Sequence, residues 1–434
     1  MAIVSASGAG QQGNTVGAGG HIDAPGLRPF VMALFFIFGG ITSLNDVIIP
    51  KLKDLFTLNY MQAMLIQTAF FAAYAIVGLP GAALVKRVGY MRGTVIGLLT
   101  MMAGCLLFIP ASSNAIFGLF LLALFVLASG VTIVQVVANP LISLLGPPGT
   151  VHSRLTFAQA FNALGTTVFP YFGAIIILGG LANVDSSALE GVALDAYRAA
   201  ETQTVVRAYL GLALALATVA LVVWINRHRL KNEQHDQGSI LAIFDLLRQR
   251  RFAFGVLSIF LYVGAEVAIG SIIVSYLSEE RVLGLTDRAA GQLIPLYWGG
   301  ALVGRFIGSA LLRAISPGKV LAFNAMGAVV LLAISVSTTG TVAGYSLLAI
   351  GLMNSIMFPT IFSLASEGLG ARAADGSGVI CVAIVGGAII PPLMGHLADV
   401  SGSLAIAMAL PAFCYVLIAA FGIYARRGVA AAVE

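Results

Sequence analysis

The chain has 434 residues, of which 59% are hydrophobic and only 9% are charged. Because an ordinary soluble domain carries about 25% charged residues, a soluble fold of this size is excluded. The net charge of +5 does not indicate nucleic-acid binding, since the basic residues are scattered between apolar runs rather than gathered in a patch. The composition therefore predicts an all-α membrane protein that crosses the bilayer many times.

The first residues are rich in Gly, Ala and Ser and lack the basic and apolar regions of a signal peptide. We expect residues 1–27 to form a disordered cytoplasmic tail. The cysteines Cys105, Cys381 and Cys414 all lie inside apolar runs. Their spacing indicates neither a disulfide framework nor a metal site, so no cofactor or metal is expected.

Twelve apolar segments follow, separated by clusters of charged and turn-forming residues. Each is long enough to cross a hydrocarbon core, which takes about 20 helical residues. We therefore predict twelve transmembrane helices near residues 28–50, 60–84, 92–110, 114–141, 154–180, 203–226, 252–278, 288–314, 319–338, 342–366, 375–398 and 402–425.

The positive-inside rule fixes the orientation of these helices. With the N-terminus in the cytoplasm, most of the 23 Lys and Arg residues fall on the cytoplasmic side. Both termini, including a tail over 427–434, are therefore predicted to be cytoplasmic. The longest polar interval, 227–251, divides the chain into two six-helix bundles, 28–226 and 252–426. We expect this interval to be a solvated linker with an interfacial helix.

The two halves resemble each other at matching places. "GAALVKRVGYMRG" follows the second span and "GSALLRAISPGKV" follows the eighth. The fourth and tenth spans carry Pro140 and Pro359 at the same relative depth. Proline within a span frees a backbone carbonyl, which is tolerated where the helix lines a wet site. Interrupted helices at corresponding positions of two pseudo-symmetric halves predict a transport site between them.

Two acidic residues lie well inside predicted spans, where a charge costs at least ~2.5–3.5 kcal/mol. Asp46, in "LNDVIIP", has no basic residue one turn away. A carboxyl group in a low-dielectric site is readily protonated, so Asp46 is the candidate proton carrier. A structural hydrogen bond, or proximity to the outer interface, is the alternative. Glu266 could pair with Arg305, although we favour Arg305 as a structural anchor near a cytoplasmic gate.

Neutral polar and aromatic side chains inside the spans indicate the ligand. Amides offer donors and acceptors without charge, which suits a ligand covered in hydroxyl groups. Aromatic rings supply an apolar face for a sugar ring, although each one taken singly could equally be core packing. The candidate substrate-binding residues are Asn45, Gln135, Asn139, Gln159, Asn162, Tyr262, Glu266, Trp298 and Asn354.

Several stretches carry a family resemblance over residues 28–425. They include "LNDVIIPKLK", "QVVANPLISLLG", "SRLTFAQAFNALGTTVFPYFGA", "YWGGALVGRFIGS" and "SIMFPTIFSLASEGLG". These resemble the fucose permease and glucose/galactose transporter family of the major facilitator superfamily. The usual aspartate of the superfamily's loop motif is absent, with Val85 near its place.

The resemblance implies proton-coupled monosaccharide uptake by alternating access. Asp46 falls on the family's proton-linked aspartate. The fucose branch has a glutamate where this chain has Gln135, which favours the branch that takes glucose, galactose or N-acetylglucosamine. Some members of the family use sodium instead of protons.

We therefore predict a monomeric monosaccharide:proton symporter in the bacterial inner membrane, with a hexose such as glucose or galactose as substrate. The partners expected are the sugar, the coupling ion and the lipid bilayer. The alternatives are a sodium-coupled sugar symporter, an L-fucose or N-acetylglucosamine permease, a proton-driven exporter of the same fold, or a non-transporting sugar sensor. An enzyme is not expected, because no catalytic motif is found and the five histidines lie in tails, in loops or at a span end, where we expect them to be solvated.

Overall fold

The computed structural model describes residues 27–56, 60–113, 116–178, 192–229 and 240–426. Within these ranges the backbone forms helices joined by turns, without a β-strand. The predicted tails over 1–27 and 427–434 lie outside the described residues, apart from Leu27. In the predicted linker, the described parts are the short 3-10 helices η4 (Arg227–Arg229) and η5 (Ile240–Arg248), and residues 230–239 between them lie outside the described ranges.

The N-terminal half forms long, uninterrupted helices. They are α1 (Arg28–Phe56), α2 (Tyr60–Val88), α3 (Tyr90–Ser113), α4 (Phe117–Leu144), α5 (Val151–Leu178) and α6 (Val192–Ile225), with η2 (Pro148–Thr150) before α5. The interruption predicted at Pro140 is wrong, because α4 continues through this proline to Leu144.

The C-terminal half is built from shorter pieces. They are α7 (Arg250–Ser278), α8 (Asp287–Gly291), α9 (Ile294–Leu311), α10 (Pro317–Ser337), α11 (Gly340–Asn354), α12 (Met357–Ala365), η6 (Gly370–Arg372), α13 (Ala373–Ala383), α14 (Gly386–Ser401), α15 (Leu404–Ala407) and α16 (Ala409–Tyr424). The predicted tenth span is therefore interrupted, as α11 and α12, close to Pro359.

Every predicted span overlaps one helix or one consecutive pair of helices. Among the described residues, nine segments are long and apolar enough to cross a membrane, and Arg28–Ile41 is a shorter apolar helix. Many large apolar side chains point away from the protein interior, including Leu214, Leu221, Phe323, Val330 and Phe413. Such an apolar exterior around backbone-satisfied helices is what a bilayer requires, so the prediction of an all-α membrane protein is confirmed.

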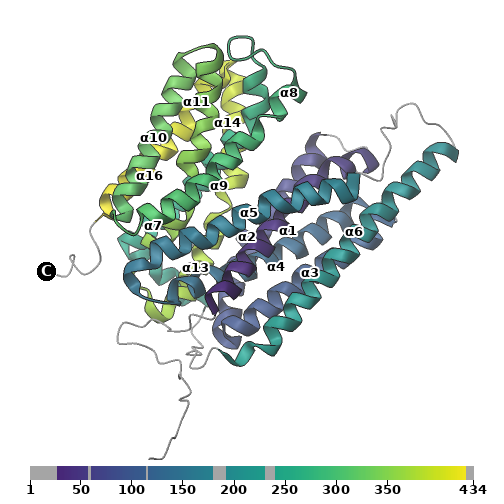
Figure 1. Ribbon diagram of the computed structural model, residues 1–434, viewed down its shortest axis with the longest axis horizontal. Helices are drawn as coiled ribbons and strands as arrows, with labels where there is room; N and C mark the ends of the chain where they lie inside the picture. Colours follow the sequence, from purple (N-terminus) through teal and green to yellow (C-terminus); the bar gives the residue numbers. More distant parts are fainter. Residues whose placement is uncertain (1–26, 57–59, 114–115, 179–191, 230–239, 427–434) are drawn as a thin grey trace, which may run out of the picture.

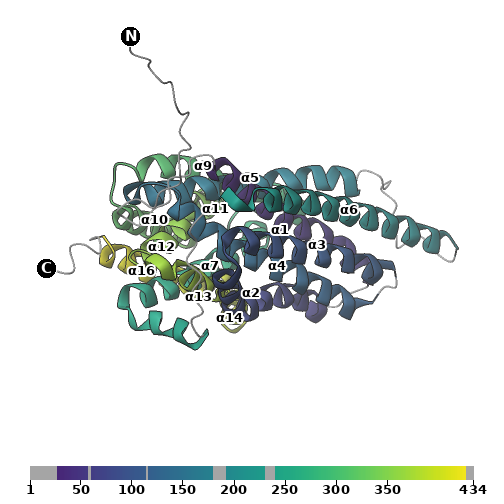
Figure 2. The ribbon, with the colours of Figure 1, turned by 90° about the horizontal axis from the view of Figure 1, so that it is seen from below.

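The helices form two groups that meet at one end of the molecule (Figure 1). Helices α1–α6 pack on one another, and α7–α16 pack on one another. Contacts between the groups run from α2 to α13 and α14, from α4 to α13, and from α5 to α9 and α12. Figure 2 shows the same arrangement from below, with α5 beside α9 and α2 beside α13 and α14. We call the end at which α2 finishes and α5 and α13 begin the closed end.

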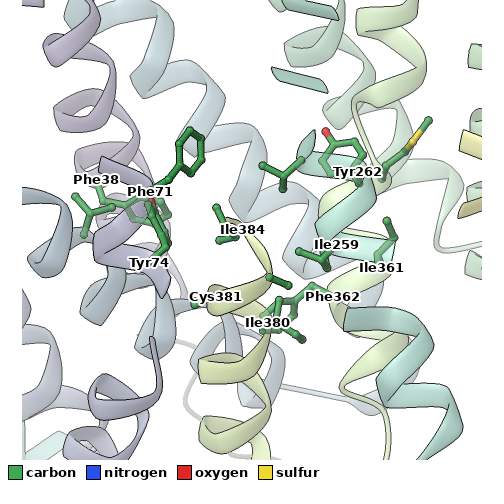
Figure 3. Close-up of a cluster of buried hydrophobic side chains, with 14 of the residues drawn as sticks. Phe38, Phe71, Tyr74, Ile259, Tyr262, Ile361, Phe362, Ile380, Cys381 and Ile384 are labelled. Carbon is green, nitrogen blue, oxygen red and sulfur yellow. The ribbon is translucent and has the colours of Figure 1, made fainter. Parts of the chain in front are cut away.

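Apolar side chains fill this junction (Figure 3). Ile380 and Cys381 of α13, and Ile384 just after its end, lie between Phe71 of α2 and Ile259 of α7. All five belong to one buried cluster that continues through both groups of helices. The halves are therefore joined by a packed core at the closed end rather than by polar contacts alone.

Glycine residues determine where α2 ends and how closely α9 packs on its neighbours. Helix α2 ends at Val88 because Gly89 takes a positive φ of 84°, which favours glycine and stops a helix. This stop places Lys86 in the last turn of α2. Gly304 and Gly308 of α9 leave no room for a Cβ atom against Ser355 and Ile356, so α9 packs closely on the junction of α11 and α12 at these glycines.

Candidate functional site

The N-terminal half contributes amide side chains from two neighbouring helices. Gln159 of α5 donates from Nε2 to Oδ1 of Asn139 on α4 over 3.2 Å, and both side chains are buried. Asn162, one turn further along α5, donates from Nδ2 to the carbonyl of Phe35 in α1 over 3.3 Å. The Oε1 atom of Gln135 on α4 is buried and has no hydrogen-bond partner among the described residues. This amide therefore keeps a free acceptor.

The C-terminal half contributes a hydrogen-bonded cluster from three helices. The hydroxyl group of Tyr262 on α7 shares its one proton between two acceptors, Oε1 of Glu266 at 2.7 Å and the carbonyl oxygen of Asn354 at 3.1 Å. Asn354, which ends α11 and is fully buried, donates from Nδ2 to the hydroxyl of Tyr297 on α9 over 2.8 Å. Tyr262, Glu266, Tyr297 and Asn354 thus form one connected group, which we call the tyrosine–asparagine cluster.

The helix break between α11 and α12 makes this cluster possible. Pro359 lies in the first turn of α12 and has no N–H to donate to the carbonyl of Ser355, four residues earlier. That carbonyl instead accepts a hydrogen bond of 3.2 Å from Nε of Arg305. The neighbouring carbonyl of Asn354 accepts from Tyr262. The freed carbonyls thus receive side-chain donors from α9 and α7, as buried backbone groups require.

Arg305 also connects the two halves. Its Nη1 atom donates to the carbonyl of Gln159 in α5 over 3.2 Å, while Nε is bonded to Ser355. One guanidinium therefore ties the break in the C-terminal half to the helix that carries the N-terminal amides. Glu266 and Arg305 are both described, and they form no ion pair; Glu266 bonds instead to Tyr262.

Other predicted site residues lie outside these two groups or outside the described side chains. Asn45 and Asp46 fall within helix α1, but their side chains are not among the described ones. Trp298 is 44% exposed and meets the ring of Tyr297 edge-on with centroids 5.0 Å apart. Its ring also approaches Gly270 of α7: a Cβ atom added to this glycine would lie 3.4 Å from Cζ2 of Trp298. Trp298 therefore adjoins the tyrosine–asparagine cluster without joining its hydrogen bonds.

An ion pair that was not predicted from the sequence joins the halves at the closed end. Lys86 at the end of α2 lies 3.2 Å from Oδ2 of Asp375 in α13; the Asp375 side chain is buried and that of Lys86 is nearly so. Arg372, three residues earlier, lies 3.4 Å from the same oxygen. Asp375 supplies the acidic partner that Val85 does not provide in the loop after the second span. The signal was present in the sequence as a lone Asp at the start of the eleventh predicted span.

A second polar group joins the halves beside this pair. His152 of α5 lies 2.7 Å from the hydroxyl of Ser363 through Nδ1 and 3.0 Å from Oε1 of Glu367 through Nε2. Arg251 of α7 pairs with the other oxygen of Glu367. The expectation that the histidines are solvated is wrong for His152, whose side chain is 12% exposed. The cause is tertiary contact with α12, which local sequence does not reveal.

The chemistry of these groups is that of recognition rather than bond breaking. Amide, tyrosine and carboxyl groups provide many donors and acceptors, and aromatic rings lie beside them. Within the described ranges, no group of three or more His, Cys, Asp or Glu residues is placed to hold a metal ion. The arrangement is suited to a polar, uncharged ligand held between two halves.

Comparison with known proteins identifies the family of the chain. A family model for the Major Facilitator Superfamily matches residues 31–384. A glucose/galactose transporter of Brucella abortus is 51% identical over 394 residues, 91% of this chain and 92% of that protein. The L-fucose-proton symporter of Escherichia coli is 34% identical over 403 residues, 91% of this chain and 92% of that protein.

The solved structures include a close match in fold. The crystal structure of the transporter FucP in the outward conformation superposes with a TM-score of 0.85 at 32% identity, covering 92% of this chain and 98% of that one. Since these relatives are transporters and not enzymes, the expectation that this chain is not an enzyme is confirmed. The chain is a multi-pass membrane transporter of the Major Facilitator Superfamily and belongs to the family of the glucose/galactose transporters and L-fucose-proton symporters.

Proposed function

We propose that the protein is a monosaccharide:proton symporter that takes up a hexose such as glucose or galactose across the bacterial inner membrane. The observation that carries this proposal is that buried amides on α4 and α5 and the tyrosine–asparagine cluster are connected by Arg305, which binds the carbonyls of Gln159 and of Ser355, next to Asn354. The relatives named above as sugar transporters support the same substrate class.

The sugar binds between the two groups of side chains in this proposal. Asn139, Gln159 and Asn162 bind hydroxyl groups from one side, and the free Oε1 of Gln135 accepts one more. Asn354 and Tyr262 bind from the other side, and the exposed face of Trp298 covers the apolar side of the sugar ring. An amide at Gln135 rather than a carboxylate favours glucose or galactose over L-fucose.

Asp46 is the proton carrier in this proposal, with Asn45 beside it in the substrate site. Both lie in α1, which packs against α5, the helix that carries Gln159 and Asn162. Protonation of Asp46 removes a charge that is costly in the membrane and permits the loaded carrier to change conformation. Glu266 is bonded to Tyr262 and is assigned to sugar binding rather than to coupling.

Transport proceeds by alternating access of the two halves, each of which is proposed to be one six-helix domain. The closed end carries Lys86, His152, Arg313 and Arg372, all from loops or helix ends predicted to be cytoplasmic. Placing this end in the cytoplasm, with both termini, satisfies the positive-inside rule. The halves then contact each other on the inner side and part on the outer side, which agrees with the outward conformation named for FucP.

The test is sugar-triggered alkalinisation of the medium outside lightly buffered, de-energised cells that express the chain, with a panel of monosaccharides. We expect alkalinisation with glucose or galactose and its loss in Asp46→Asn. Sodium-dependent uptake without a proton signal would reject Asp46 as proton carrier and make the chain a sodium symporter. A response to L-fucose or N-acetylglucosamine alone would reject the hexose assignment.

Two rival functions have their own outcomes in the same cells. Proton-driven efflux of a hydrophobic cation, without sugar uptake, would identify an exporter of the same fold. Saturable sugar binding without flux would identify a sensor. Light scattering of the purified protein in detergent tests the proposed monomer, and cell fractionation tests the inner-membrane location.

A further inference from the structure

A groove on the C-terminal half lies outside both groups of site residues. Its volume is about 480 Å³, and it lies between α9 and α10 over the junction of α11 and α12. Gly304, Ile307, Gly308 and Leu311 of α9 line one wall, while Val320, Phe323 and Asn324 of α10 line the other. Leu352, Met353, Ser355 and Ile356 form the floor. The proposed transport mechanism assigns no role to this groove.

One end of the groove carries a positive charge, whereas the rest is apolar. Lys319, in the first turn of α10, lines the groove and is exposed. Its ammonium group has neither an ion pair nor a hydrogen bond with any described residue. Arg313, in the turn between α9 and α10, does not line the groove; its Nε atom donates to the hydroxyl of Ser153 on α5 over 3.3 Å, so Lys319 is the cation that lines this end. The rim at the closed end is therefore cationic.

The groove is long enough to reach more than halfway through one leaflet of a bilayer. From Leu311, at the end of α9, to Gly304 the helix axis rises about 10 Å at about 1.5 Å per residue. From Lys319 to Asn324 the rise along α10 is about 8 Å by the same geometry. A half-bilayer of hydrocarbon is about 15 Å thick. The groove therefore begins at the interfacial rim and ends well inside the hydrocarbon region of the same leaflet.

We propose that this groove is a binding site for one anionic phospholipid from the leaflet at the closed end. The phosphate headgroup pairs with Lys319, and an acyl chain lies along Leu311 and Ile307 toward Leu352. Charge complementarity argues for a lipid with net negative charge, because basic pockets between membrane helices bind such headgroups. The exposed apolar side chains Ile307 and Phe323 at the walls continue into the lipid-facing surface, which favours an acyl chain over a polar occupant.

The test is phospholipid retention by the purified full-length protein, measured by native mass spectrometry. Delipidated protein is titrated with phosphatidylglycerol or with phosphatidylcholine of the same acyl chains. We expect one phosphatidylglycerol to be retained about fivefold more strongly than phosphatidylcholine, the effect of one lysine at a membrane surface. Lys319→Gln should remove this preference, whereas Arg250→Gln, an exposed cation outside the groove, should keep it.

A second pair of variants tests the acyl-chain contact. Leu311→Trp fills the groove and should lower retention of both lipids, whereas Val330→Trp, at an exposed position of α10 outside the groove, should not. All four positions are exposed, and an unchanged thermal unfolding midpoint confirms that each variant folds. Equal retention of the two lipids by the wild type would overturn the proposal. So would a preference that survives Lys319→Gln, or full retention by Leu311→Trp.

Discussion

The pair between Lys86 and Asp375 makes a quantitative prediction about the conformational equilibrium. The two atoms are 3.2 Å apart, and the side chains are only 10% and 2% exposed. A hydrogen bond to a charged group contributes about 1.5–3 kcal/mol. Arg372, which also reaches Asp375, remains in Lys86→Met, so we do not expect the full cost of an unpaired buried carboxylate. At the closed end the two halves are either in contact or apart. The substitution should shift the ratio of these two populations toward the separated state by roughly 10- to 150-fold.

Spin labels at Arg87→Cys and Arg250→Cys measure this shift. Both positions are exposed near the closed end, and they belong to opposite halves. The distance distribution between them should gain a longer component when Lys86→Met is added. Labelling is specific because the native thiols are all buried, at Cys105, Cys381 and Cys414.

A matched exposed pair supplies the control. Arg248 lies 3.7 Å from Asp245, but the side chains are 87% and 57% exposed. Such surface pairs contribute about 0–1 kcal/mol, so Arg248→Met should leave the distances unchanged. A distribution for Lys86→Met identical to that of the wild type would refute the reasoning that this pair holds the halves together.

Three further predictions concern the site. Asn354→Ala should lower kcat/KM for sugar uptake roughly 5- to 150-fold, since it removes a buried donor worth about 1–3 kcal/mol to Tyr297; normal uptake at equal expression would contradict this. Gly351→Ala should lower the thermal unfolding midpoint in detergent, because a Cβ there meets the backbone of Tyr297 and overpacking costs about 1–3 kcal/mol. Gly211→Ala, with open space around it, is its control, and equal midpoints would contradict the packing account. Arg305→Lys keeps the charge but loses the planar fork that reaches two carbonyls; uptake should fall at unchanged membrane expression, and unchanged uptake would show that charge alone suffices.

The overall fold was readable from the sequence because its determinants are local. A run of about 20 apolar residues has few alternatives to a membrane helix. The amides on α4 and α5 were also found, since few polar side chains occur within spans and each one stands out. The structure brings two of them, Asn139 and Gln159, into a hydrogen bond.

The missed features depend on contacts between distant segments. Nothing near His152 in sequence indicates that Glu367 and Ser363 will enclose it. The different effects of the two prolines also depend on contacts with distant segments. Pro140 leaves α4 continuous, whereas near Pro359 the helix breaks, and there the freed carbonyls are bound by Arg305 and Tyr262. Those donors lie on α9 and α7, so the effect of a proline depends on neighbours that the local pattern does not contain.

Helix α5 gives the transport proposal a physical constraint. It carries Gln159, whose carbonyl binds Arg305, and about 9 Å along its axis it carries Ser153, at about 1.5 Å per residue. Ser153 donates to the carbonyl of Ser309 on α9 over 2.6 Å. Because a helix moves as a rigid unit, opening the closed end must break the contacts of Ser153 and Gln159 together. A ligand shifts such an equilibrium only by binding the two conformations differently. Contacts that form between the halves at the opposite end, together with tighter binding of sugar and proton in the opened state, must therefore offset the loss of these two contacts.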